Sequence, residues 1–144
     1  MRTRTVGALS TAVLAICAAG CGSSGGSYAN ASRPPAPVTL SIAVADGRIA
    51  ISPDHVGAGP TVLLIANEST RSRDVTLTPA LGSGRGCVTA DASSGPIAPQ
   101  GSARIKLPLV EGACAIGVTG GGLPPAQLVV GPQRESGQQD LLQP

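Results

Sequence analysis

Few side chains in this 144-residue chain are suited to chemistry, and most of those are cysteines. The sequence holds four cysteines, at positions 17, 21, 87 and 114, and a single histidine, His55. His55 follows Asp54, so this pair could help to hold a metal ion, although a solvated imidazole in a loop is the plainer interpretation. One histidine cannot make a zinc site of the His-Glu-x-x-His type. We predict a protein that is not an enzyme, with no catalytic residue, no metal site and no cofactor.

The first 20 residues have the pattern of an export signal. Arg2 and Arg4 form a basic start, and residues 6–16 form an apolar stretch that is too short to cross a bilayer as a helix. Residues 18–21 then read Ala-Ala-Gly-Cys, which resembles the lipobox of bacterial lipoproteins. The departure from that family is Ala18, where Leu is more usual.

This resemblance implies that residues 1–20 are a signal peptide and that lipid is attached at Cys21. In bacterial lipoproteins the cysteine thiol receives a diacylglycerol, the chain is cut before it, and the new amine is often acylated, for example with palmitate. Two acyl chains give a stable anchor, whereas one gives only marginal binding. The predicted location is therefore the extracytoplasmic face of the cell membrane. The alternative is an ordinary secretory signal that is cleaved after Gly20.

Charge and aromatic content argue against nucleic acid as a partner. The formal net charge is +2, but two of the ten basic residues, Arg2 and Arg4, belong to the predicted signal, which leaves eight basic and eight acidic side chains. No basic patch exists to bind phosphates, and Tyr28 is the only aromatic residue available to stack on bases.

Two cysteines remain once Cys17 leaves with the signal and Cys21 is lipidated. Cys87 and Cys114 would then be the only thiols in an oxidising compartment, where a disulfide is the simplest outcome. The alternative is a redox-active or Cu(I)-binding dithiol, but their spacing is far from Cys-x-x-Cys. We predict a Cys87–Cys114 disulfide that staples a core without Phe or Trp.

Composition divides the rest of the chain into three parts. Residues 21–37 are rich in Gly, Ser and Pro and are predicted to form a flexible tether, and residues 132–144 a polar, disordered tail. Between them, residues 38–131 break into short segments of alternating apolar and polar residues, clearest at 38–45 and 102–109. Residues 53–60 are predicted to be a loop. Seven or eight such strands and no helical period predict an all-β Greek-key sandwich.

Several short motifs in this domain resemble those of the cupredoxin family. They are the run Gly57-Ala58-Gly59-Pro60 before a strand that ends in Asn67, the turn Pro99-Gln100-Gly101, the start Glu111-Gly112-Ala113-Cys114 and a final strand at 126–130. The resemblance covers residues 38–131 and implies a cupredoxin-like sandwich. An immunoglobulin-like sandwich is the alternative.

The residues that would bind copper in that family are missing from this chain. A blue-copper site uses two His, a Cys thiolate and usually a Met. Arg73-Asp74-Val75 stands where the first His is expected, and residues 118–125, where the remaining ligands are expected, contain none of these types. The only Met is Met1, so we predict that the protein is not a type 1 copper carrier.

These observations favour a binding role over catalysis. We expect a membrane-anchored, non-catalytic module that binds an envelope protein through loops at one end of the sandwich. The alternative is a copper-handling accessory protein that uses His55, Asp54 or the Cys pair. A small-ligand site between the sheets is the third option, although a domain of this size barely fills its own core.

Overall fold

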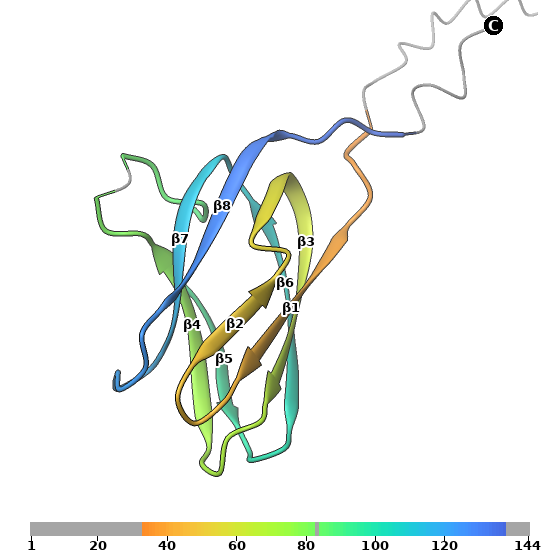
Figure 1. Ribbon diagram of the computed structural model, residues 1–144. Helices are drawn as coiled ribbons and strands as arrows, with labels where there is room; N and C mark the ends of the chain where they lie inside the picture. The colour runs from red at the N-terminus through yellow and green to blue at the C-terminus, as the bar shows by residue number, and fades with distance from the viewer. Residues whose placement is uncertain (1–32, 83, 138–144) are drawn as a thin grey trace, which may run out of the picture. The chain divides into compact units, whose positions relative to one another are not determined.

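The computed structural model describes residues 33–82 and 84–137, and within them the regular structure is entirely β. The predicted signal peptide, Cys21 and the last seven residues lie outside the described residues. Eight strands follow one another along the chain (Figure 1): β1 (Val38–Val44), β2 (Ile49–Ser52), β3 (His55–Asn67), β4 (Arg73–Pro79), β5 (Ala92–Ile97), β6 (Ser102–Leu109), β7 (Gly112–Val118) and β8 (Ala126–Gln133). This part of the chain contains no helix that is long and apolar enough to cross a membrane.

The strands form two layers that share β3. In the first layer, the second half of β3 pairs in parallel with β1 and antiparallel with β6, and β2 pairs with the free side of β1. In the second layer, the first residues of β3 pair in parallel with β8, which is followed by β7, β4 and β5. The pairing of β3 with β8 shifts register between Gly57 and Ala58, where β3 passes from one layer to the other.

The core between the layers is aliphatic, since the whole chain has no Phe and no Trp. Alternate residues of the strands point into it, as the sequence pattern predicts. The buried apolar side chains are Leu40, Ile42, Val44, Ile49, Ala58, Leu63, Ile65, Val75, Leu77, Cys87, Ile97, Leu109, Cys114, Ile116, Val118, Leu128 and Val130. The two cysteines therefore belong to the packed interior.

Two strand assignments from the sequence need correction. Residues 53–60 were expected to form a loop, but β3 begins at His55 because β8 supplies backbone partners for this Gly-rich segment, with Val129 opposite His55. The edge strand β5 was not predicted, because its sequence, Ala-Ser-Ser-Gly-Pro-Ile, has no alternation of apolar residues. A side chain helps to join β5 to its neighbour, since Val75 N donates to Ser94 Oγ at 2.9 Å.

The domain also extends past both boundaries drawn from composition. Strand β8 runs to Gln133, two residues beyond the expected end at 131, and Arg134 N donates to the Ala58 carbonyl at 3.0 Å. At the other end, Pro35 is buried although it belongs to the predicted tether. Arg134 links the two extensions, because its Nη1 donates to the Ala36 carbonyl at 2.9 Å. Polar composition concealed these contacts, which depend on residues about a hundred positions apart.

Candidate functional site

Four connections gather at one end of the sandwich, which we call the distal end. They are residues 45–48, 68–72, 98–101 and 119–125, at the lower end of the domain in Figure 1. Backbone hydrogen bonds join two of them at the end of β3, because Asn67 N donates to Gly101 O at 2.9 Å and Gln100 N donates to Asn67 O at 2.8 Å. The opposite end, where residues 33–37 enter the domain, is called the tether-side end.

Asn67 organises the distal end from within. Its side chain is 1% exposed, and Nδ2 donates to the carbonyls of Arg71, Ile97 and Ala98 at 2.8, 2.9 and 3.1 Å. Its Oδ1 accepts from Ser69 N at 3.1 Å and from Ser69 Oγ at 2.6 Å. One buried amide therefore joins two connections, residues 68–72 and 98–101, to the end of β5, and it fixes how the β3–β4 connection leaves the sheet.

Asp46 holds the same connection from the outside. Its Oδ1 accepts from Thr70 N at 3.1 Å and from Thr70 Oγ1 at 3.2 Å, and the Arg73 guanidinium lies 3.9 Å away. Arg73 Nε also donates to Ser69 Oγ at 3.2 Å. Residues 68–72 are thus anchored at both faces while Glu68, Thr70 and Arg71 remain exposed. In the sequence, Asn67 stands out only as the last residue of an expected strand, and nothing marks it as the centre of a network.

The two segments that would bear copper ligands in a cupredoxin do meet at this end. Thr119 N donates to the Asp74 carbonyl at 2.8 Å, so the start of β4 and the end of β7 lie side by side. The side chains there are of other types: Asp74 Oδ1 accepts from Ser93 Oγ at 2.6 Å. Among residues 33–82 and 84–137, no three His, Cys, Asp or Glu side chains come close enough together to hold a metal ion.

The connection between β7 and β8 is built from glycine. Gly120, Gly121 and Gly122 have φ values of +84°, +72° and +90°, a left-handed region that side chains rarely tolerate. Gly121 N donates to Val118 O at 3.1 Å and closes a tight turn. The chain therefore reaches the half-buried Leu123 along a path that only glycine adopts without strain.

The predicted disulfide is present. Cys87 and Cys114 are joined, their Cα atoms are 5.4 Å apart, and both side chains are 0% exposed. Cys87 N also donates to Cys114 Sγ at 3.1 Å. The bond ties the long connection between β4 and β5 to the middle of the second layer, in a position shielded from solvent.

His55 and Asp54 form an isolated exposed pair. His55 Nδ1 lies 3.0 Å from Asp54 Oδ1, and the side chains are 71% and 68% exposed. The hydrogen bond with His55 is the main cause that lowers the pKa of Asp54 below its ordinary value. In the sheet, His55 stands opposite Val129, which pairs with Ala113, whereas Asp74 lies beside Val118 at the other end of β7. The fold thus keeps this pair apart from the distal-end loops.

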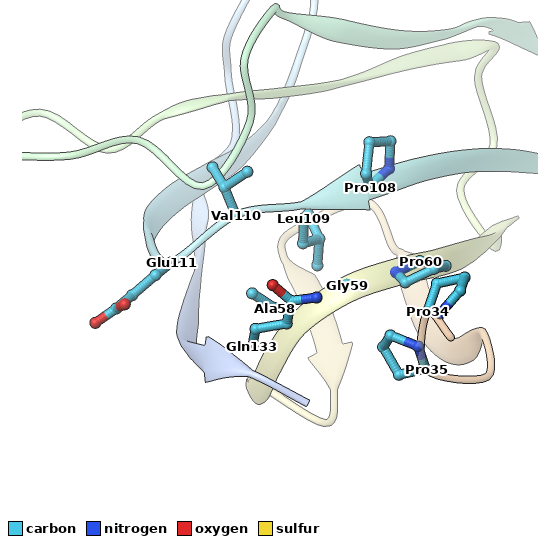
Figure 2. Close-up of a pocket in the computed structure, with 10 residues that line it drawn as sticks. All are labelled: Pro34, Pro35, Ala58, Gly59, Pro60, Pro108, Leu109, Val110, Glu111 and Gln133. Carbon is cyan, nitrogen blue, oxygen red and sulfur yellow. The ribbon is translucent and has the colours of Figure 1, made fainter. Parts of the chain in front are cut away.

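An open pocket of about 400 Å³ lies at the tether-side end. Figure 2 shows its lining residues: Pro34, Pro35, Ala58, Gly59, Pro60, Pro108, Leu109, Val110, Glu111 and Gln133. Four of these ten are prolines, and Glu111 is the one ionisable side chain among them. The pocket lies beside the shared strand β3, and most of its lining residues are apolar.

Comparison with known proteins identifies the fold. No family model matches the chain, and no curated protein matches it. Among solved structures, reduced auracyanin from the photosynthetic bacterium Roseiflexus castenholzii superposes with a TM-score of 0.50 at 14% identity, over 68% of this chain and 99% of auracyanin. A multicopper oxidase, mgLAC, is similar over 68% of this chain and 39% of its own length, with 14% identity and a TM-score of 0.42.

The domain is a cupredoxin-like β-sandwich. The match spans 99% of auracyanin, so the likeness extends over a whole domain of that kind. At this level of identity the likeness establishes the fold alone.

Proposed function

We propose that this protein is a lipid-anchored, extracytoplasmic lipoprotein whose cupredoxin-like domain is a non-catalytic binding or scaffold module of the cell envelope. The distal end binds an envelope protein. The observation that carries the proposal is the Asn67 network, which fixes the surface formed by residues 68–72. A loop whose backbone is already ordered loses less entropy on binding, so it is suited to recognition.

The anchor supports the same role. Lipid at Cys21 would hold the tether-side end near the membrane, because residues 33–37 enter the domain there. The distal end would then face away from the membrane, toward other envelope proteins. Glu68, Thr70 and Arg71 are exposed at this end and offer one acid, one hydroxyl and one base to a partner.

Site-specific photocrosslinking in living cells tests this proposal. A photoreactive amino acid at Glu68 is expected to give one discrete crosslinked protein. The same amino acid at Lys106, an exposed position on the edge strand β6, serves as the matched control. Equal crosslinking from both positions, or none from either, would contradict binding through the distal end.

Copper handling is the second candidate, and the likeness to auracyanin favours it. It would have to use the exposed Asp54–His55 pair, because the disulfide removes both remaining thiols. Native mass spectrometry of the protein solubilised from its own membrane separates the two roles. Stoichiometric copper that is lost in His55→Ala would replace the scaffold role, whereas a bare lipidated chain would leave it in place.

A further inference from the structure

The connection between β4 and β5, residues 80–91, contains Leu81, a fully exposed apolar residue. Leu81 has a relative exposure of 103%, so none of its side chain is covered. The other large apolar side chains that are exposed in the described residues are Leu64 and Val129, at 38% and 42%, and both lie flat on strands. Leu81 is thus the one large apolar side chain in this part of the chain that stands entirely in water.

The base of this connection is fixed to the sheet. Ala80 N donates to Ala113 O at 3.0 Å, and Ala113 N donates to Arg85 O at 3.0 Å, so one residue of β7 holds both arms. A Cβ on Gly86 would lie 2.8 Å from Pro79 Cβ, which shows how closely the arms are packed. The Cys87–Cys114 disulfide follows directly. Leu81 therefore projects from a firm base.

Leu81 and the tether share one end of the domain. Ala113, which holds the base, is two residues from Glu111, and Glu111 lines the same pocket as Pro34 and Pro35 (Figure 2). In Figure 1, residues 80–82 and 84–91 and residues 33–37 lie at the upper end of the domain, opposite the distal end. From Cys21 to Arg33 the chain can span at most about 40 Å. An anchor at Cys21 would keep this end close to the bilayer.

We propose that Leu81 inserts into the boundary between headgroups and acyl chains of the membrane that carries the lipid anchor. This inference rests on the proposed lipidation of Cys21. Moving the leucine side chain out of water is favourable, and a tether makes the contact intramolecular, at a high effective concentration. A single leucine would not hold a free domain on a bilayer, but it orients a domain that is already anchored. The sandwich then stands on its tether-side end and presents the distal end outward.

Charge does not drive this contact. Arg85 is exposed beside Leu81, but Asp91 on the same connection and Glu111 near its base oppose it. With no excess of positive charge, attraction to anionic lipids contributes little. We therefore expect the same insertion into vesicles of pure phosphatidylcholine and into vesicles that also contain phosphatidylglycerol, at low and high salt.

The absence of tryptophan makes the test direct. The full lipidated protein with Leu81→Trp is reconstituted into phosphatidylcholine vesicles with and without bromine on the acyl chains. We expect a blue-shifted emission and at least a two-fold loss of intensity in brominated vesicles. Arg48→Trp, at an exposed position of the distal end, is the matched control and should keep a water-like emission that bromine does not quench.

Flotation of the same vesicles separates this inference from the anchor. If Leu81→Trp protein floats but its emission matches that of Arg48→Trp, insertion of Leu81 is wrong and the lipid anchor stands. If the protein neither floats nor is quenched, both proposals fail. If both tryptophans are quenched equally, the domain lies on the bilayer without the orientation that we propose.

Discussion

Arg134 lies so close to Gly57 that a Cβ on this glycine would be 2.5 Å from Arg134 Cγ. The arginine then donates through Nε to the carbonyls of Gly57 and Ala58, at 3.1 and 3.3 Å, and through Nη2 to Pro60 O at 2.6 Å. These are the residues at which β3 changes layers. Arg134 therefore supplies the hydrogen bonds that the irregular part of β3 does not receive from a neighbouring strand.

Removal of this side chain is expected to weaken the whole domain. Arg134→Ala removes the side-chain donor from the carbonyls of Ala36, Gly57 and Pro60, while the Ala58 carbonyl keeps the backbone N–H of residue 134, and we expect a loss of about 2 kcal/mol in the free energy of unfolding. Urea denaturation measures this loss. Arg104→Ala, on an exposed position of β6, is the control and should change the free energy by less than about 0.5 kcal/mol.

The close contact between Gly57 and Arg134 predicts that substitutions at these two positions do not change the free energy of unfolding independently. Gly57→Ala should destabilise the domain by about 1–3 kcal/mol, because the new methyl group meets the arginine side chain. In an Arg134→Ala background the same substitution should cost less, although the Pro132 carbonyl at 2.9 Å still crowds it. If the losses in free energy of unfolding simply add in this double-mutant cycle, the Arg134 side chain is not what excludes a larger residue at position 57.

Asn67→Ala should be among the most damaging substitutions at the distal end. It removes the donor to three carbonyls and the acceptor for Ser69 in a buried place, so we expect a loss of about 3 kcal/mol. Hydrogen exchange should also show faster exchange of the amides of residues 69–71. Gln127→Ala, on the exposed face of β8, is the control. An unchanged exchange pattern would mean that the network does not order this loop.

The disulfide should contribute about 3–4 kcal/mol on the chain-entropy model, since its cysteines are 27 residues apart. The Cys87→Ala/Cys114→Ala double variant is expected to lose this amount or more, because two buried side chains also shrink. Because both sulfurs are fully buried, we expect the folded wild type to resist reductant until it unfolds. Rapid reduction under native conditions, followed by mass spectrometry, would contradict this expectation.

The Asp54–His55 pair predicts a local titration. The hydrogen bond with His55 lowers the pKa of Asp54, so His55→Ala should raise this pKa toward its ordinary value of 3.8. Stability from a lowered carboxyl pKa is present above the ordinary value and is lost as the pH falls through the lowered pKa. Carboxyl NMR measures the shift. Since both side chains are exposed, the stability that this pair contributes should be small.

The alternation of apolar and polar residues was sufficient to predict the regular strands from the sequence. The alternation at Val38–Val44 and Ser102–Leu109 predicted β1 and β6, because one face of each strand lies on the core. The disulfide followed from counting thiols in an oxidising compartment. Both depend on information that is close in the sequence or carried by residue type alone.

The remaining features depend on distant partners. The first residues of β3 read as a loop because their backbone partners lie in β8 and on Arg134, 77 residues after Gly57. Strand β5 has no apolar period because Ser94 and Ser93 join it to β4 through their hydroxyl groups. Asn67 gave no sign of its role, because its acceptors are backbone carbonyls, and these have no signature in the sequence.

The parallel pairing of β1 with β3 determines how the domain should resist a force that pulls on its N-terminal residues. Seven residue pairs, from Val38 opposite Thr61 to Val44 opposite Asn67, run along the axis in which the N-terminal residues leave the domain. A pull on those residues acts along the strand, so it stretches all the rungs together and does not unzip them one by one. Arg134, bound to the Ala36 carbonyl, takes the first share of that force. A domain that is held by its N-terminal residues should therefore resist a pulling force without separation of β1 from β3.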